Sequence, residues 1–181
     1  MASGDTLVIF TPHANEPPAT NYASVDLRNV HLVLDFNDAV AESAVFSGLL
    51  PRNYAGGGIT VTIVWMGGSA GLLRAAGQPV RDVITPLATG GVKWNAAFER
   101  HQAGIDDLDS DSFATAQTAT GAAPATDGST AYTSIAFTSG AQMDSLAVGE
   151  SFRLKVTRDA ADAADTMTGD AELLMIEIRE T

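Results

Sequence analysis

The chain has 181 residues and a mass of 18.7 kDa, so it is long enough to form one domain with a hydrophobic core of its own. Its 22 acidic and 10 basic residues give a formal net charge of −12, which excludes a general binder of nucleic-acid phosphates and argues against an anionic membrane surface as a partner. The absence of cysteine excludes disulfides, thiolate metal sites and thiol nucleophiles.

Residues 1–22 are expected to form an extended arm ahead of a single domain that spans 23–181. Within the arm, residues 7–10 are a weak strand candidate. The stretch that follows contains Pro12, Pro17 and Pro18, and proline cannot donate a hydrogen bond to a sheet. Such an arm suits contacts with a neighbouring subunit, so the three prolines are predicted interface residues.

The domain is dominated by alternation of apolar and polar residues with period two, the pattern of half-buried strands. Val92, Trp94, Ala96 and Phe98 form the apolar face of the clearest example, and residues 151–158 repeat the design. Further strands are predicted at 7–10, 30–36, 44–50, 59–66, 114–120, 132–138 and 174–179.

Helical signals are limited to 38–42 and 141–146. About eight or nine short strands with few helices predict an all-β fold, an antiparallel jelly-roll-like β-sandwich. Trp65 and Trp94 lie in the most apolar strands and are expected in its core. In the last strand, residues 174, 176 and 178 are expected to face the core.

One connection, residues 67–91, is far longer than the usual turn between strands. It contains six spaced apolar residues that need a surface to cover them: Leu72, Leu73, Val80, Val83, Ile84 and Leu87. We therefore expect this inserted loop to contribute to an interface.

The same loop begins with a match to the nucleophile-elbow pattern G-x-S-x-G around Ser69, followed by Asp82 and His101 in the order of a hydrolase triad. That motif requires a parallel sheet with crossover helices, whereas the downstream sequence alternates with period two. A flexible glycine-rich loop start is the better interpretation. The sequence predicts no catalytic residues, no cofactor and no enzyme activity.

Carboxylates at alternate positions, Asp107, Asp109 and Asp111, are the best candidates for a metal site. An EF-hand is excluded because Ser112 and Thr118 stand where glycine and a bidentate glutamate are required. A solvated acidic turn is favoured, with a looser calcium site as the alternative, so no metal is predicted. The same interpretation applies to Asp159, Asp162, Asp165 and Asp170.

The histidines show no metal-binding spacing. His13 lies beside a proline of the arm, His31 begins a predicted strand, and His101 is distant from both in sequence. Surface or strand roles are the favoured interpretation.

Several strand-and-turn phrases between residues 44 and 181 occur in the order found in one type of bacteriophage virion protein. They are Leu50-Pro51-Arg52-Asn53-Tyr54, Gly56-Gly57-Gly58-Ile59-Thr60, Val92-Lys93-Trp94, Asp109-Ser110-Asp111-Ser112-Phe113, Phe152-Arg153-Leu154 and Gly169-Asp170-Ala171-Glu172. With them the chain resembles virion jelly-roll proteins of the capsid decoration, or cement, type. The 67–91 connection is longer than in that pattern.

The resemblance implies a structural protein, made in the host cytoplasm, that binds the outer surface of a phage head and stabilises it by bridging capsomers. Its expected partners are the major capsid protein and further copies of itself, with a trimer as the expected oligomer, and neither nucleic acid nor membrane. The alternative is a jelly-roll module of a tail or fibre that binds a host receptor or glycan. Replacing Leu72, Leu73, Val83 and Ile84 with serine is expected to weaken assembly while the monomer still folds.

Overall fold

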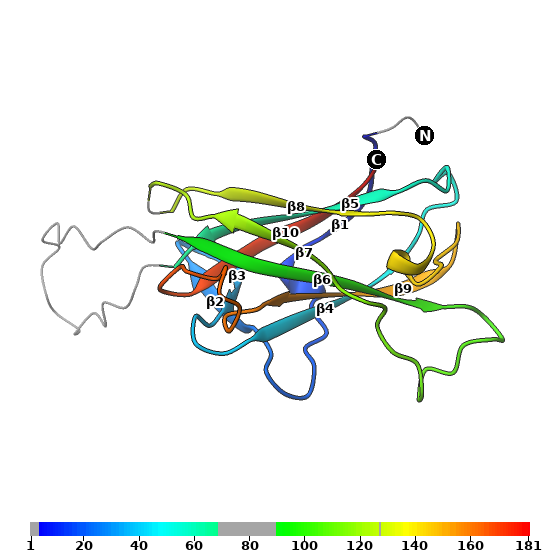
Figure 1. The fold of residues 1–181 in the computed structure, drawn as a ribbon, viewed down its shortest axis with the longest axis horizontal. Coiled ribbons are helices and arrows are strands. Elements are labelled where there is room, and N and C mark those ends of the chain that lie inside the picture. The colour runs from blue at the N-terminus through cyan, green and yellow to red at the C-terminus, as the bar shows by residue number, and fades with distance from the viewer. Residues whose placement is uncertain (1–3, 69–89, 127) are drawn as a thin grey trace, which may run out of the picture.

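The computed structural model describes residues 4–68, 90–126 and 128–181, which form two antiparallel sheets packed face to face (Figure 1). The larger sheet has the order β2-β3-β10-β5-β8, with β1 also paired to β10. Its strands are β1 (Thr6–Phe10), β2 (Ser24–Arg28), β3 (His31–Phe36), β5 (Ile59–Gly67), β8 (Ala131–Phe137) and β10 (Ala171–Glu180). The smaller sheet has the order β4-β9-β6-β7, with strands β4 (Glu42–Leu49), β9 (Ser151–Arg158), β6 (Gly91–His101) and β7 (Gln117–Ala122).

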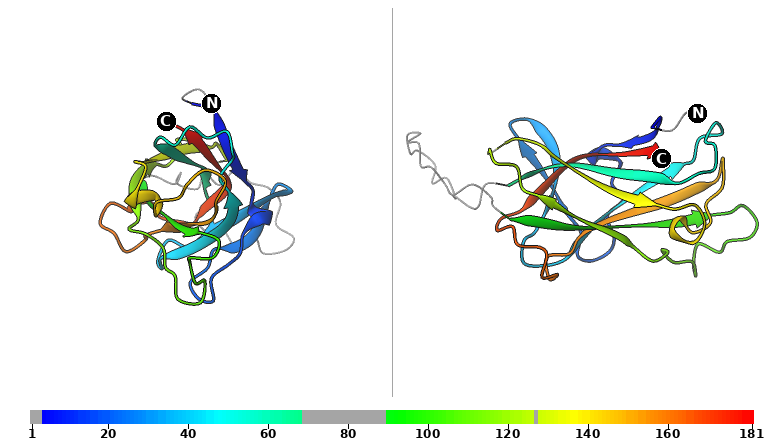
Figure 2. Two further views of the ribbon diagram at one scale, coloured as in Figure 1. Left: turned by 90° about the vertical axis from the view of Figure 1, so that its right-hand side faces the viewer. Right: turned by 45° about the horizontal axis from the view of Figure 1, so that its top comes forward.

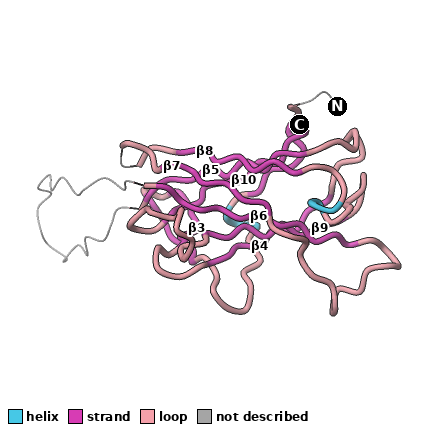
Figure 3. Tube along the Cα trace, viewed as in Figure 1, coloured by secondary structure: helices cyan, strands magenta, loops and turns pink. Residues whose placement is uncertain are grey.

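The predicted all-β sandwich is therefore confirmed, and the described residues contain ten strands rather than eight or nine. The helical elements in this part of the chain are two short 3-10 turns, η1 (Pro12–Ala14) and η2 (Ala141–Met143), drawn in cyan in Figure 3. The expected helical turn at 38–42 does not form. No helix among the described residues is both long and apolar enough to cross a membrane.

The core lies between the two sheets, whose strands surround it in the end-on ribbon view of Figure 2. It forms because alternate residues of each strand point inward and bury their apolar side chains. Trp65 of the larger sheet and Trp94 of the smaller one are fully buried and meet with ring centroids 5.9 Å apart. Phe98 bridges the sheets in the same way, 5.0 Å from Phe137. The prediction that both tryptophans belong to the core is confirmed.

Strand β10 differs from its predicted alternation. Its register shifts between Leu173 and Met175, so a bulge places one extra residue in the strand. Leu173 therefore joins Ile176 and Ile178 in the core, and Leu174 does not continue their row. A bulge cannot be read from the spacing of apolar residues alone.

The N-terminal segment is part of the sandwich and does not form a separate extended arm. Residues 6–10 form β1, which pairs with β10 and buries Phe10 against Phe46 at a ring-centroid distance of 5.4 Å. Strand β1 runs beside β10 in Figure 1, and just before it Gly4 N donates to Glu180 O at 2.8 Å. The rest of the segment crosses toward β4, and Asn15 Oδ1 accepts a hydrogen bond from Val45 N at 3.1 Å.

Strand β2 was not predicted, although residues 24–28 alternate. It forms a hairpin with β3 through a two-residue turn at Asn29 and Val30, whose φ values are 47° and 62°. Positive φ at both central residues is the type I′ geometry that matches the twist of hairpin strands. Val30, predicted as the first residue of a strand, is thus a turn residue and is 90% exposed.

Candidate binding sites beside strand β2

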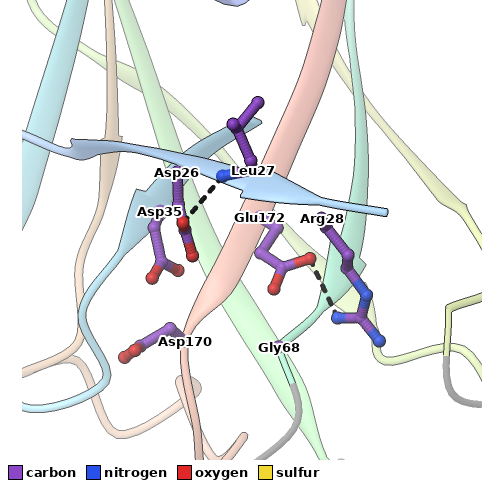
Figure 4. Close-up of a pocket in the computed structure, with 7 residues that line it drawn as sticks. All are labelled: Asp26, Leu27, Arg28, Asp35, Gly68, Asp170 and Glu172. Carbon is purple, nitrogen blue, oxygen red and sulfur yellow. Dashed lines mark hydrogen bonds and ion pairs between the residues drawn. The ribbon is translucent and has the colours of Figure 1, made fainter. Parts of the chain in front are cut away.

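Two concave surfaces lie beside β2, the edge strand of the larger sheet. Asp26 and Arg28 contribute to an acidic pocket, whereas Val25 contributes to an apolar groove formed with the N-terminal segment. Successive side chains of a strand point to opposite faces, which places Asp26 and Arg28 on one face and Val25 on the other. The linings are not strictly separated, because Leu27 also borders the acidic pocket and Ser24 the groove. Figure 4 shows Leu27 on the other side of the strand from the carboxylates of Asp35 and Glu172.

The acidic pocket has a volume of about 240 Å³. It is lined by Asp26, Leu27, Arg28, Asp35, Gly68, Asp170 and Glu172. The register places Asp35 of β3 opposite Glu172 of β10, so these two carboxylates share one face of the sheet (Figure 4). At its edge, Asp170 Oδ1 accepts a hydrogen bond from Asp38 N at 3.2 Å.

Arg28 partly neutralises this pocket. Its Nη1 donates to Glu172 Oε2 and to Gly67 O, both at 2.9 Å. The side chains of Arg28 and Glu172 are 20% and 11% exposed, so the pair is shielded from solvent more than a surface ion pair. Four acidic side chains line the pocket against this one cation, so the pocket stays negatively charged.

Asp35 is the carboxyl group of the pocket whose charged form is least favoured. Burial, followed by repulsion from Asp170, Glu172, Asp26 and Glu42, raises the pKa of Asp35 to about 7. Its Oδ1 is buried and has no hydrogen-bond partner among the described residues. Near neutral pH this carboxyl group is consequently divided between its protonated and ionised forms.

The apolar groove has a volume of about 450 Å³. It is lined by Pro12, His13, Asn15, Pro17, Tyr22, Ala23, Ser24, Val25 and Leu32. Tyr22 is 51% exposed at this groove and Val25 is 63% exposed. Two of the three predicted arm residues, Pro12 and Pro17, therefore line one surface, while Pro18 is half-buried outside it.

The predicted metal-site residues are accounted for by a turn. Asp107 Oδ1 accepts a hydrogen bond from Asp109 N at 3.1 Å, and its backbone oxygen accepts from Asp111 N at 2.9 Å. Asp107 Oδ2 also accepts from Ser110 Oγ at 3.2 Å. These bonds show the carboxylate capping a turn. Within the described ranges, no group of three or more histidine, aspartate or glutamate residues has a metal-binding arrangement.

The remaining predicted residues fall outside the part of the chain that the structure describes. They are Leu72, Leu73, Val80, Val83, Ile84 and Leu87 of the predicted interface, together with Ser69 and Asp82 of the rejected triad. His101, the third member of that triad, lies at the end of β6.

Sequence reasoning missed the acidic pocket. Its residues come from β2, β3 and β10, from Gly68 just after β5 and from Asp170 just before β10, and only the sheet order brings them together. The one local signal was the alternation of Asp26 and Arg28 with Val25 and Leu27, which marks a strand with one charged and one apolar face.

No family model and no curated protein matches the chain. Among solved structures, it is similar to the xylan-binding CBM22-2 domain of Xyn10C from Paenibacillus barcinonensis, with 12% identity, a TM-score of 0.48 and coverage of 94% of this chain and 93% of that one. It is also similar to a cycloisomaltooligosaccharide glucanotransferase from Paenibacillus sp., with 13% identity and a TM-score of 0.47 over 96% of this chain but 18% of the enzyme.

A further similar structure is TmCBM27, a carbohydrate-binding module that recognises mannan, with 11% identity, a TM-score of 0.38 and coverage of 96% and 89% of the two chains. The likeness in each case concerns the β-sandwich architecture and nothing finer.

Proposed function

We propose that this domain is a non-catalytic binding module of a bacteriophage virion, and specifically a decoration protein on the outer surface of the capsid. The observation that supports a binding role is the apolar groove between the N-terminal segment and β2. In a chain with a net charge of −12, an apolar concavity of about 450 Å³ is a candidate docking site for a protein segment. The virion context comes from the resemblance of its strand-and-turn phrases.

The proposed partner of the groove is an extended segment of the major capsid protein. Pro12, Pro17 and Val25 present a rigid apolar wall, because proline has little conformational freedom to lose on binding. Asn15 is held in place, since its side chain already bonds Val45 N. Rigid walls of this kind lower the entropic cost of docking, which suits a protein that holds a shell together.

A glycan-binding module of a tail or fibre is the second candidate, and Tyr22 is the observation that favours it. This tyrosine is 51% exposed beside His13, Asn15 and Ser24, which can exchange hydrogen bonds with hydroxyl groups. Aromatic rings provide an apolar face with a polar tip, a combination that suits a sugar ring. This role is of the same broad class as that of the polysaccharide-binding modules, and it uses the same groove.

Reconstitution separates the two candidates. Purified protein is added to phage heads that lack it, and bound protein is measured after sedimentation. Tyr22→Ala and Val25→Ser should each reduce binding to heads at least several-fold, whereas Tyr132→Ser, an exposed residue on the opposite edge strand, should bind normally. Full binding by both groove variants would contradict docking through the groove.

The same variants are then tested on immobilised host-surface polysaccharide. Binding of the unmodified chain to the polysaccharide, lost in Tyr22→Ala, together with no binding to heads, would establish the tail or fibre role instead. Binding to neither surface would overturn both candidates.

A further inference from the structure

Strand β2 has a free backbone edge. In the described part of the chain it pairs with β3 alone, and its burial pattern leaves Ser24 to Leu27 exposed. Arg28 and His31 close the two-residue turn, and pairs along such a ladder alternate between exchanging hydrogen bonds and exchanging none. This alternation directs the N–H and C=O groups of Val25 and Leu27 away from β3, toward solvent.

Three large apolar side chains are exposed along this edge and at its turn. Val25 and Leu27 are each 63% exposed, and Val30 at the hairpin tip is 90% exposed. Natural sheets protect an edge with charged residues, proline or a bulge, because an open apolar edge pairs with other strands. Strand β2 has no proline, and its two charged residues, Asp26 and Arg28, are of opposite sign, so they do not repel a second copy of the same strand.

We propose that the free edge of β2 pairs antiparallel with β2 of a second copy of this chain, centred on Leu27, so that the larger sheets of the two copies become one continuous sheet. The arrangement has a two-fold axis, since the same strand is used by both partners, and it closes as a dimer. A trimer, the oligomer expected from the sequence resemblance, would require a different surface.

Charge complementarity selects this register. Centring on Leu27 places Asp26 opposite Arg28 of the second copy on both sides of the axis, which pairs opposite charges. Centring one residue earlier would place Asp26 opposite Asp26, and like charges directly opposite each other destabilise a strand pair.

In the single chain, one backbone donor of this edge is already occupied by a side chain. Asp26 Oδ1 accepts a hydrogen bond from Leu27 N at 2.7 Å, so the carboxylate occupies the backbone donor that a second strand needs. On pairing, the carbonyl of Leu27 from the partner takes that donor, and the Asp26 carboxylate turns toward the opposing Arg28, whose guanidinium is already bonded to Glu172 and Gly67 O in its own chain. The exchange replaces a local bond with a strand-to-strand one.

The contact of one short strand with its copy is small. Covering Val25, Leu27, Val30 and the strand edge buries less than the roughly 1,600 Å² of a standard interface, so we expect a weak, reversible dimer. This inference does not rest on the virion role, because it concerns the purified chain in solution.

Cysteine crosslinking tests the register directly, because the chain has no cysteine of its own. Leu27→Cys places two thiols across the two-fold axis at a spacing suited to a disulfide, so mild oxidation should convert most of the protein to a covalent dimer. Tyr132→Cys, on the opposite edge strand β8 and 70% exposed, is the matched control and should remain largely monomeric. Val25→Cys should crosslink less than Leu27→Cys, because its partner across the axis is Asn29.

Sedimentation velocity of the unmodified chain at about 100 µM should show the dimer, and Asp26→Arg should abolish it by placing two arginines opposite each other. Circular dichroism confirms that this variant is folded. A monomer at that concentration, or crosslinking of Leu27→Cys no greater than that of Tyr132→Cys, would overturn the inference. Stronger crosslinking of Val25→Cys would overturn the register.

Discussion

Arg158 and Asp165 form a two-pronged ion pair that is fully enclosed by the sandwich. Arg158 Nε lies 3.1 Å from Asp165 Oδ2 and Nη2 lies 2.9 Å from Oδ1, while the two side chains are 0% and 2% exposed. The guanidinium also donates to the carbonyl oxygens of Phe36, Met167 and Gly169. Arg158, from the smaller sheet, thereby holds the loop before β10 against the end of β3. Asp170 of that loop and Asp35 of β3 both line the acidic pocket.

Asp165→Asn is expected to lower the free energy of unfolding by about 3–5 kcal/mol, because it leaves the Arg158 charge buried without its counter-charge. Urea denaturation measures the loss. Asp109→Asn, in an exposed turn, is the matched control and should change stability by no more than about 0.5 kcal/mol. Equal stability of the two variants would contradict the structural role of the buried pair.

This pair also shows where sequence reasoning ended. The sequence predicts a solvated acidic loop around residues 159–170, and this prediction is wrong for Asp165, whose side chain is 2% exposed. The neighbouring sequence does not distinguish Asp165 from Asp162. The Asp162 carboxylate instead caps a turn of the same loop, where it accepts a hydrogen bond from Ala164 N at 2.8 Å. Only the position of Arg158, set by the packing of β9, selects one carboxylate for burial.

Strands with one apolar and one polar face were predictable, and β6 and β9 formed where Val92, Phe98, Phe152 and Val156 alternate with polar residues. The sandwich followed from the number of such strands. Strand β2 was missed because its alternation covers only five residues and neither face is buried in the core, so no long run of apolar positions marks it. Both candidate surfaces lie beside this strand, which is why the candidate sites were less predictable than the fold.

Asp35 gives the chain a pH-dependent stability. The pKa of Asp35 rises from 3.8 to about 7, so between these values the folded chain holds more protons than the unfolded chain. The free energy of unfolding contributed by this group therefore falls as the pH increases through that window, and the loss is complete above the folded pKa.

Asp35→Asn removes this contribution. We expect the variant to be more stable than the unmodified chain by about 1–2 kcal/mol at pH 8, with allowance for the partial exposure of the pocket, and similar to it near pH 4. Urea denaturation across this pH range provides the measurement. Parallel stability curves for the two proteins would show that Asp35 titrates normally.

Gly121 of β7 tests the packing of the two sheets. A Cβ atom there would lie 1.9 Å from Thr133 Oγ1, which accepts a hydrogen bond from Trp65 Nε1 at 2.9 Å. Gly121→Ala should force Thr133 to rotate and leave the indole donor unpaired, at a cost of about 2–3 kcal/mol. Gly57→Ala, where nothing lies within 4 Å of the added Cβ, should have little effect on the melting temperature.

Val30 of the β2–β3 turn has a backbone conformation that is unfavourable for its residue type. Val30 adopts a φ of 62°, which is costly for a β-branched side chain, and at 90% exposure it gains no packing within the single chain. Val30→Gly should stabilise the monomer by about 1 kcal/mol and raise its melting temperature. It should also weaken the proposed dimer, since the side chain is lost from the contact. A decrease in monomer stability would contradict the assigned turn.

The measurement that tests the central claim most directly is the copy number of this chain in purified virions, determined by quantitative mass spectrometry against the major capsid protein. The decoration role predicts many copies in a fixed ratio to the shell subunit. A few copies per particle would place the chain in the tail and favour glycan or receptor binding, and its absence from particles would contradict a virion role altogether.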